Sequence, residues 1–460
     1  MALTIVALAT PTGRSGIGVV RLSGGRALEI VRTIIDGENL HFRPRFAQLV
    51  VLRDPADGEL IDEAIVTYFE GPRSFTGEDV VEISCHGSPV LLRQVIDICL
   101  SLGARTATAG EFSLRALANG RMNLSEAEAI RDLIDAQTTA SARQAIRQMR
   151  GEFSIQLQPL KDQLLDLIVV LESALEFVED DLPDVQVESV KQKLAVIAEE
   201  TGKLAATFQA GRLIREGLRV ALVGRPNVGK SSLFNALLGS DRAIVTEIAG
   251  TTRDQIHERF TIGDIPISLI DTAGLRETTD TVESIGVERS KATMADADIV
   301  IVMLDASEQT SEEDRVILKS VKDLNYIVVL NKIDKVPSTD VDRIIAAEHS
   351  SLAYLRERIM PLSAKTGEGL GELKDAIVRP FSPEDISTVG FLVTDARHHD
   401  LLVRAKSGVE ASLEQLNEKM SEEIVLIGLH NALRYLGEIT GETTTEDMLT
   451  RIFSTFCIGK

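Results

Sequence analysis

The feature that most constrains this chain is the stretch GRPNVGKSS at Gly224–Ser232, which follows the apolar run Leu218–Val223. It fits the pattern G-x-x-x-x-G-K-S, with an expected strand before it and helix-forming residues after it. Glycines let backbone N–H groups turn inward around a polyanion, and the N-terminus of the following helix adds positive charge. In such a loop Lys230 reaches the terminal phosphates of a nucleotide and Ser231 offers its hydroxyl to magnesium. The stretch predicts a phosphate-binding loop.

Length and composition limit the class of protein. A chain of 460 residues suggests about three domains. Its net charge of −21 does not attract nucleic-acid backbones non-specifically, so a nucleic-acid partner needs local patches or delivery by another protein. Three cysteines are too few for a disulfide framework. The N-terminus lacks the features of a signal peptide and no apolar run approaches the roughly 20 residues that span a bilayer, so we expect a soluble, cytoplasmic protein without membrane contact.

Residues 1–120 carry a mixture of strand and helix patterns, which predicts a compact α+β domain. Short runs rich in β-branched residues are separated by turn-forming letters, and two segments have helical spacing. The expected strands are Thr4–Ala9, Gly18–Leu22, Ala47–Leu52, Ala64–Phe69 and Val80–Ser84, and the expected helices are Gly25–Ile35 and Pro89–Leu102.

The rest of the chain divides by pattern into helical and mixed parts. Ser125 and Glu128 fit the capping box S-x-x-E at the start of a helix. Residues 214–380 alternate strand and helix patterns, which indicates a parallel sheet. The simplest architecture is one helical domain interrupted by an α/β domain, with the junctions near Leu213 and Phe381 close together. Further helices are expected at about Leu160–Phe177, Val187–Leu213, Asp400–Lys419, Glu422–Ile439 and Thr445–Phe456.

Four more motifs follow the phosphate loop in the order that a nucleotide switch requires. GTTRD at Gly250–Asp254 supplies threonines for magnesium and the terminal phosphate, and DTAG at Asp271–Gly274 supplies a carboxylate and a phosphate-sensing N–H. NKID at Asn331–Asp334 ends in an aspartate that can accept hydrogen bonds from the guanine N1–H and amino group. SAK at Ser363–Lys365 places a backbone amide near the guanine oxygen. The set predicts a GTPase domain.

The residues expected at the nucleotide come from these motifs. They are Gly224, Asn227, Val228, Gly229, Lys230, Ser231, Ser232, Gly250, Thr251, Thr252, Asp271, Thr272, Ala273, Gly274, Asn331, Lys332, Asp334, Ser363, Ala364 and Lys365.

Two details narrow the mechanism of hydrolysis. Regulatory GTPases of the Ras type carry a glutamine after DTAG that orients the attacking water, whereas this chain has Leu275 there, which cannot hydrogen-bond. Catalysis must therefore be supplied from elsewhere. Asn227 offers an amide oxygen beside the phosphates, where a monovalent cation can take the place of an arginine finger, an effect worth about 10³–10⁵ in rate.

Several further segments, outside the GTPase motifs, are characteristic of one protein family. They are TPTGRSGIGVVRLSG, SFTGEDVVE, TAGEFSLRALANGRMNLSEAEAIRDLIDA and the terminal FCIGK. With them the whole chain resembles the MnmE (TrmE) family of tRNA-modification GTPases. The resemblance implies a multidomain α+β and α/β fold: an N-terminal folate-binding-like domain, a central helical domain and an inserted P-loop, Ras-like GTPase domain. The expected limits are 1–120, then 121–213 with 381–460, and 214–380.

The resemblance also implies partners and a second site. The family forms homodimers through its N-terminal domain and works with the FAD protein MnmG (GidA) in a heterotetramer or larger complex. Together they add a carboxymethylaminomethyl or aminomethyl group at carbon five of the wobble uridine of tRNA. The one-carbon unit comes from a tetrahydrofolate derivative, 5-formyl- or 5,10-methylenetetrahydrofolate, and the residues matching its contacts are Arg21, Glu82, Arg121 and Lys460.

For the GTPase domain the resemblance implies a potassium-dependent mechanism that is activated when two such domains meet. The residue matching the family's catalytic acid is Glu283, in TVESIGVER. Glu247 and Ala249 join the nucleotide contacts. The matching magnesium ligands are Ser231 and Thr252, and the matching potassium ligands are Asn227, Thr246, Ile248 and Thr251.

Two alternatives stay open at this point. A ribosome-assembly GTPase of the Era or Der type shares the phosphate loop and DTAG motifs, but such proteins usually carry a second GTPase domain or a basic RNA-binding module. Co-purification with an FAD protein rather than with ribosomal subunits separates the two. Cys457 near the C-terminus is either inert packing or a functional thiol close to the folate pocket.

Overall fold

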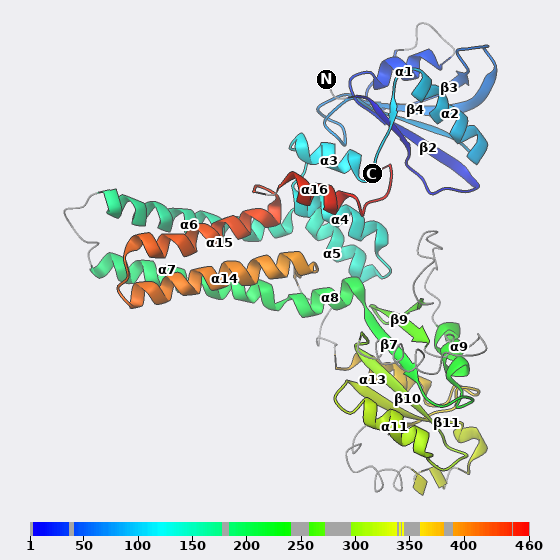
Figure 1. Cartoon of the computed structure of the whole chain (residues 1–460). Coiled ribbons are helices and arrows are strands. Elements are labelled where there is room, and N and C mark those ends of the chain that lie inside the picture. The colour runs from blue at the N-terminus through cyan, green and yellow to red at the C-terminus, as the bar shows by residue number, and fades with distance from the viewer. Residues whose placement is uncertain are drawn as a thin grey trace, which may run out of the picture. The chain divides into compact units, whose positions relative to one another are not determined.

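The computed structural model describes residues 3–35, 41–176, 184–240, 257–271, 296–337, 340–341, 343–344, 359–380, 390–443 and 445–459 (Figure 1). The chain divides into two compact units. The first contains residues 1–134, 146–198 and 404–460, and the second contains residues 135–145 and 199–403. The domain limits expected from the sequence stay a prediction.

The N-terminal part of the first unit is a six-stranded sheet with helices on one face. All neighbouring strands are antiparallel except β1 and β6. Alternate residues of the strands form a core with α1 (Ala27–Thr33) and α2 (Pro89–Ser101). On the other face Ile5 and Ala7 are buried with Phe112, whereas Leu49 and Ile65 are exposed. The predicted α+β fold is confirmed. The strand order is β3 (Ala47–Arg53), β4 (Leu60–Phe69), β5 (Val80–Gly87), β2 (Ser15–Ser23), β1 (Ile5–Leu8) and β6 (Arg105–Thr106).

A short helix that the sequence patterns did not reveal, α3 (Glu111–Ala118), is held to the sheet by one buried carboxylate. Glu111 accepts hydrogen bonds from Arg105, from Arg115 at 2.9 Å and from the backbone N–H of Thr108 at 3.0 Å. Burial alone would raise the pKa of Glu111, but these donors, Arg105 first, lower it from 4.5 to about 2. The ionised carboxylate therefore stabilises the folded chain.

This network predicts a pH-dependent stability. The stabilisation by Glu111 is fully present above about pH 4.5 and is lost as the pH falls towards 2, and the shift corresponds to about 3 kcal/mol. In Glu111→Gln we expect the amides at the β1–β6 pairing, such as the N–H of Arg105 bonded to Thr4, to exchange hydrogen faster at pH 6. The difference in exchange rate between Glu111→Gln and the parent protein should be smaller near pH 3.

Glu29→Gln is the matched control, because its carboxylate pairs with Arg26 on the surface and both side chains are more than half exposed. Its exchange should equal that of the parent protein at both pH values. Equal protection in Glu111→Gln and the parent at pH 6 would contradict the role given to Glu111.

The helical part of the first unit begins one residue earlier than the predicted capping box. Helix α4 spans Leu124–Asp135, so Ser125 lies inside it and is fully buried. The prediction that Ser125 and Glu128 form the box is wrong. Asn123 and Glu126 form it instead: the Asn123 side chain accepts from the N–H of Glu126, and the Glu126 carboxylate accepts from the N–H of Asn123, both at 3.0 Å.

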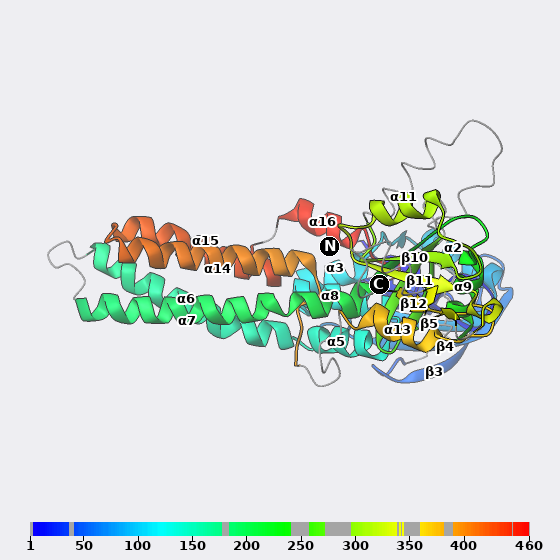
Figure 2. The ribbon, with the colours of Figure 1, turned by 90° about the horizontal axis from the view of Figure 1, so that it is seen from below.

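Four long helices run side by side in both views of the ribbon (Figures 1 and 2). They are α6 (Glu152–Glu176), α7 (Asp184–Ala206), α14 (Ala396–Asn417) and α15 (Glu422–Thr440). Small residues allow α14 and α15 to approach closely: the buried Ser412 hydroxyl donates to the carbonyl of Val425 at 2.8 Å, next to Gly428. Among the described residues no helix combines the length and apolar composition needed to cross a membrane.

The second unit is an α/β sheet covered on both faces. All its neighbouring strands are parallel except β8, which is antiparallel to β9, and two strands, β10 and β11, are buried along their whole lengths. One core contains residues of α9 (Lys230–Ser240) and α13 (Leu370–Val378), and the other contains Leu318 of α11 (Glu312–Ser320). The strand order is β12 (Ile359–Pro361), β11 (Tyr326–Asn331), β10 (Ile299–Asp305), β7 (Leu218–Val223), β9 (Ile265–Asp271) and β8 (His257–Ile262).

The two chain segments that enter and leave this sheet lie together within the second unit. Arg215 pairs with Asp395 at 2.6 Å, and a side chain at Gly211 would meet the carbonyl of Val393 at 2.1 Å. The expected closeness of the junctions near Leu213 and Phe381 stays a prediction, because Phe381 lies outside the described part. The single helix expected at Val187–Leu213 is wrong. It ends at Ala206, and α8 (Phe208–Glu216) follows. Between them the N–H of Thr207 bonds to the carbonyl of Leu204, three residues back, at 3.1 Å, and the Thr207 hydroxyl accepts from the N–H of Val393 at 3.0 Å.

Candidate functional site

The phosphate loop predicted at Gly224 lies between the end of β7 and the start of α9. Its backbone takes three positive φ angles, at Gly224 (152°), Asn227 (66°) and Gly229 (103°), which turn successive N–H groups into a concave surface. A side chain at Gly229 would come within 2.3 Å of Asn331, so only glycine fits there. The loop opens directly into a helix N-terminus. This geometry binds anions.

The charged and hydroxyl groups expected to act on phosphates are at the same place. The Lys230 ammonium donates to the carbonyl oxygens of Gly224 and Arg225 at 2.8 and 2.7 Å, so it already spans the loop. The side chains of Asn227, Ser231 and Ser232 are exposed, and Val228 is buried beneath the loop. The sequence prediction of a phosphate loop agrees with this local structure.

The NKID and SAK motifs meet the phosphate loop through one buried amide. Asn331, at the end of β11, is 2% exposed. Its Nδ2 donates to the carbonyl of Val228 at 2.8 Å, and its Oδ1 accepts from the N–H of Ala364 at 3.0 Å. A single side chain therefore holds the phosphate loop and the SAK loop together, over 103 and 33 residues of sequence.

The aspartate of NKID is positioned by the serine of SAK. The buried Ser363 hydroxyl donates to Oδ1 of the exposed Asp334 at 2.7 Å. This hydrogen bond, followed by attraction to Lys365, lowers the pKa of Asp334. The carboxylate is kept ionised with acceptor capacity towards solvent. Such a carboxylate suits the paired N–H donors of guanine.

Lys332 lies between Asn331 and Asp334 in the NKID motif and has a left-handed backbone conformation, with φ 67°. Its ammonium pairs with Asp305 at the end of β10. Burial alone would raise the pKa of Asp305, but the hydrogen bonds from Lys332 and Ser307 lower it. The carboxyl ends of β7, β10 and β11 thus carry one connected site, at the edge of a parallel sheet where ligands bind in such folds.

Arg225 was not identified from the sequence, although it braces the phosphate loop. Its Nε donates to Asp314 at 2.9 Å, and its Nη2 pairs with Glu308 at 3.2 Å. Asp314 is almost fully buried and also closes a capping box with Ser311 at the start of α11. The pattern S-x-x-D at residues 311–314 was the available signal for the cap. Nothing local in the sequence indicates that Arg225 reaches it.

Part of the predicted site lies outside the described residues. Of the DTAG motif only Asp271 is described, and its backbone pairs in register with Leu222 of β7. The expected residues outside the described part are Thr246, Glu247, Ile248, Ala249, Gly250, Thr251, Thr252, Thr272, Ala273, Gly274, Glu283 and Lys460.

A second polar site occupies the face of the N-terminal sheet opposite to α1 and α2. Arg21 of β2 and Glu82 of β5 are cross-strand neighbours, and they pair at 2.8 Å with side chains 17% and 28% exposed. The Arg21 guanidinium also lies 5.7 Å from the ring centroids of Phe75 and Phe112. Its Nη1 donates to the carbonyl of Gly459 at 3.0 Å. The Arg21 guanidinium, the Glu82 carboxylate and two aromatic rings therefore lie together, next to the C-terminal segment.

Two further described residues were expected near this site, Arg121 and Cys457. Arg121 donates to the carbonyl of Ser74 at 3.2 Å, the residue before Phe75. Cys457 is exposed, whereas Cys85 and Cys99 are buried, and burial raises the pKa of both buried thiols to about 12. Only Cys457 among the three is accessible for chemistry at neutral pH.

The parallel sheet, the phosphate loop and the NKID and SAK motifs at the strand ends define the second unit as a P-loop GTPase domain. Two family models match the chain: one described as GTP-binding protein TrmE N-terminus, over residues 4–121, and one described as MnmE helical domain, over residues 124–457. The chain belongs to the MnmE (TrmE) family of tRNA modification GTPases.

Curated relatives support the same assignment over the whole length. Proteins named tRNA modification GTPase MnmE from Koribacter versatilis, Aquifex aeolicus and Alkaliphilus metalliredigens are 45%, 44% and 41% identical, each over 99% of this chain and 99% of its own length. A solved structure of Era from Aquifex aeolicus is 32% identical over 42% of this chain and 66% of its own, with a TM-score of 0.31. The end-to-end relatives do not favour the ribosome-assembly alternative.

Proposed function

We propose that this chain binds and hydrolyses GTP and that the hydrolysis serves the modification of tRNA. The observation that carries the proposal is the double hydrogen bond of Asn331, which holds the phosphate loop and the base-reading loop in one arrangement. Asp334 then presents an ionised carboxylate where guanine N–H donors are expected. Family membership supports tRNA as the substrate that is modified.

Several residues of this domain take part in the hydrolysis of GTP. The N–H groups of the phosphate loop and the Lys230 ammonium bind the phosphate oxygens. Leu275 cannot orient water, so we assign the alignment of the attacking water to Glu283, whose carboxylate is an acceptor at neutral pH. The activation of hydrolysis is assigned to the expected dimerisation of two GTPase domains.

The two described ligand candidates fit the ions that the family implies. Ser231 exposes its hydroxyl in the first turn of α9, and Asn227 exposes its amide in the phosphate loop. When bound, magnesium and potassium would supply positive charge to the phosphate oxygens. The residues proposed to hold magnesium are Ser231 and Thr252, and those proposed to hold potassium are Asn227, Thr246, Ile248 and Thr251.

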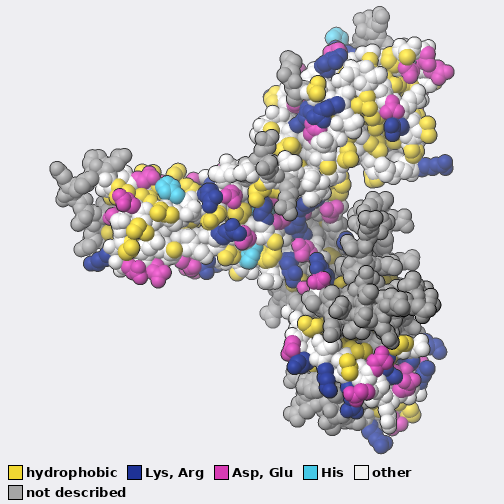
Figure 3. Space-filling model, viewed as in Figure 1, with side chains coloured by type: hydrophobic (Ala, Val, Ile, Leu, Met, Phe, Trp, Pro, Cys, Tyr) yellow, Lys and Arg dark blue, Asp and Glu magenta, His cyan; other side chains and the backbone are white. Residues whose placement is uncertain are grey.

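The finer part of the proposal concerns the product. With the FAD protein MnmG (GidA), the chain would add a carboxymethylaminomethyl or aminomethyl group at carbon five of the wobble uridine, using a tetrahydrofolate one-carbon unit. Its N-terminal domain would form a homodimer. The exposed part of the sheet supports that dimer, since Leu49 and Ile65 are directly opposite in register, exposed by 71% and 46%. The space-filling view shows hydrophobic side chains at the surface of this N-terminal part (Figure 3).

The folate site is assigned to Arg21, Glu82, Arg121 and Lys460. A guanidinium can meet the ring oxygen or glutamate carboxylates of a folate, and the Glu82 carboxylate can accept from pterin N–H groups. We expect Arg21→Ala and Glu82→Ala to weaken 5-formyltetrahydrofolate binding by about 10- to 100-fold, since each loses a charge-assisted hydrogen bond. Calorimetry on the full-length protein measures this.

Arg93→Ala is the control for this test, because Arg93 is exposed on α2 and pairs only at the surface with Asp97 among the described residues. Its affinity for the folate should equal that of the parent protein. Unchanged affinity in both Arg21→Ala and Glu82→Ala would move the folate site elsewhere.

A further inference from the structure

The C-terminal segment of the first unit connects the helical part to the Arg21 site. We call residues 441–459 the strap; all of it except residue 444 is described. It starts where α15 ends and includes α16 (Glu446–Phe453). It ends on the N-terminal sheet.

The far end of the strap is held by backbone contacts. Ile458 bridges to Ala109, and the Cys457 carbonyl accepts from the N–H of Gly110 at 3.4 Å. Gly459 has φ 100°, and any side chain there would lie 2.3 Å from the carbonyl of Leu8. Its carbonyl accepts from Arg21. The end of the strap therefore supplies one of the hydrogen-bond partners of Arg21, beside Glu82.

The middle of the strap packs through two aromatic rings. Phe453 and Phe456, with ring centroids 5.0 Å apart, join a core with Leu124 and Ala127 of α4. The Thr455 hydroxyl also accepts from Arg131 of α4 at 2.8 Å. The middle and the far end of the strap are thus held in place, and a polar contact at its near end would hold the remainder.

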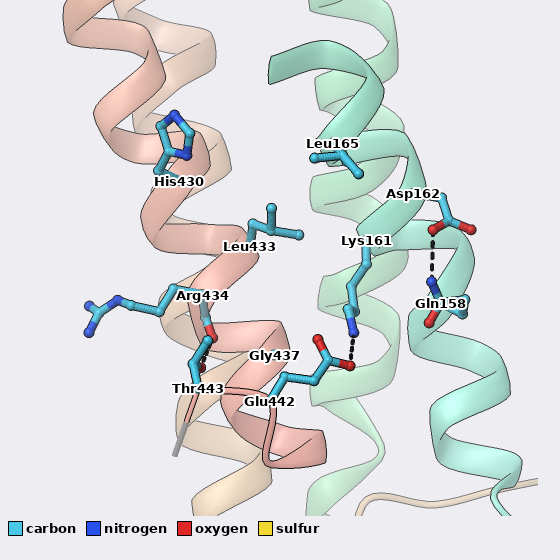
Figure 4. Close-up of a pocket in the computed structure, with 10 residues that line it drawn as sticks. All are labelled: Gln158, Lys161, Asp162, Leu165, His430, Leu433, Arg434, Gly437, Glu442 and Thr443. Atoms are coloured by element: carbon cyan, nitrogen blue, oxygen red, sulfur yellow. Dashed lines mark hydrogen bonds and ion pairs between the residues drawn. The ribbon is translucent and has the colours of Figure 1, made fainter. Parts of the chain in front are cut away.

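The near end of the strap carries that polar contact. Gly441 leaves α15 in a left-handed conformation with φ 90°, and the N–H of Glu442 returns to the carbonyl of Gly437 at 3.0 Å. The Glu442 carboxylate pairs with Lys161 of α6 and accepts from the Thr440 hydroxyl at 3.1 Å. The pair lies beside a surface cavity of about 610 Å³ between α6 and α15 (Figure 4).

The two partners of this ion pair differ in burial. Lys161 is only 8% exposed, whereas the side chain of Glu442 is 55% exposed. The other carboxylate lining the cavity, Asp162, accepts from Gln158 at 2.7 Å, and Glu442 is the one carboxylate paired with Lys161 among the described residues. A buried ammonium without a partner is costly, so Lys161 favours the strap position that brings Glu442 to it.

We propose that the Lys161–Glu442 ion pair anchors the start of the strap and thereby positions Gly459 against Arg21 at the far end. Lys161 is then a positioning residue for the Arg21 site, with no contact to that site itself. The inference rests on the proposed folate site only for its binding measurement, since the position of the strap can be followed without any ligand.

The protein carries its own attachment point for a probe of the strap. Cys457 is exposed and Cys85 and Cys99 are buried, so a nitroxide reagent should label Cys457 selectively in the full-length protein. In Lys161→Met, which leaves the solvated Glu442 carboxylate without a buried charge opposite it, we expect a mobile component to appear in the spectrum. Without any label, hydrogen exchange at the N–H of Gly110 should accelerate by about tenfold or more.

Three further variants sharpen the test. Lys161→Arg keeps the charge and should retain the parent spectrum, whereas Glu442→Gln should show the mobile component. Lys203→Met is the matched control, because Lys203 pairs with Glu199 and Glu200 on the surface of α7. Its spectrum and exchange should equal those of the parent. Parent-like spectra and exchange in both Lys161→Met and Glu442→Gln would overturn the proposal.

Calorimetry completes the experiment. The positioning role predicts that Lys161→Met weakens 5-formyltetrahydrofolate binding by about tenfold, consistent with the loss of one oriented hydrogen-bonding group. A mobile strap with parent affinity would overturn the positioning of Arg21. If the parent protein does not bind the folate at all, the folate assignment fails, and the spectra and exchange rates still decide whether Lys161 anchors the strap.

Discussion

GTP turnover by the full-length protein should be faster in potassium than in sodium at equal ionic strength, by roughly 10³-fold if the cation replaces an arginine finger. The reason is that Leu275 cannot orient water and Asn227 exposes an amide oxygen in the phosphate loop. Sodium is smaller and fits the same oxygens poorly. Steady-state release of phosphate in the two salts measures the difference.

The backbone conformation of Asn227 decides which substitution tests this prediction. Asn227 has φ 66°, so Asn227→Ala removes the amide but also strains the backbone. Asn227→Gly removes the amide and keeps the left-handed conformation. Both should abolish the difference between the salts and leave GTP affinity largely intact. Asn235→Ala, on the exposed side of α9, should keep the difference in rate between the two salts. Equal rates in the two salts for the parent protein would refute the cation mechanism.

Base choice should reverse in Asp334→Asn. The variant should bind GTP about 10²–10⁴-fold more weakly, because two hydrogen bonds to a charged acceptor are worth about 1.5–3 kcal/mol each. Xanthosine triphosphate should bind better than GTP, since it offers an oxygen where guanine offers its amino group. Competition against a fluorescent nucleotide measures both affinities.

Ser363→Ala separates charge from orientation in the same site. It keeps the Asp334 carboxylate but removes the hydrogen bond that positions it, so we expect a smaller loss of about tenfold in GTP affinity and no gain for xanthosine triphosphate. Asp323→Asn, whose side chain is 86% exposed, should behave as the parent protein. An Asp334→Asn variant with parent affinity for GTP would exclude Asp334 as the base-reading residue.

Local patterns predicted the elements of the fold well. The alternation of apolar residues indicated the strands of the N-terminal sheet, and the buried runs before the phosphate loop and NKID indicated parallel strands. Helix ends were less certain. Asn123 rather than Ser125 caps α4, although the pattern N-x-x-E at residues 123–126 was present in the sequence. The division of one expected helix at Thr207 had no such signal, since the Thr207 hydroxyl bonds to Val393, 186 residues away.

The sequence by itself determined the chemistry of the phosphate loop, since Gly224, Gly229 and Lys230 act through neighbouring backbone groups and need only a strand before them and a helix after them. Only the tertiary structure decided what holds those parts in place. Arg225 reaches Asp314 across 89 residues, Lys161 reaches Glu442 across 281, and Arg21 reaches Gly459 across 438. Such pairs depend on how the elements pack, and no local spacing of residue types carries that information.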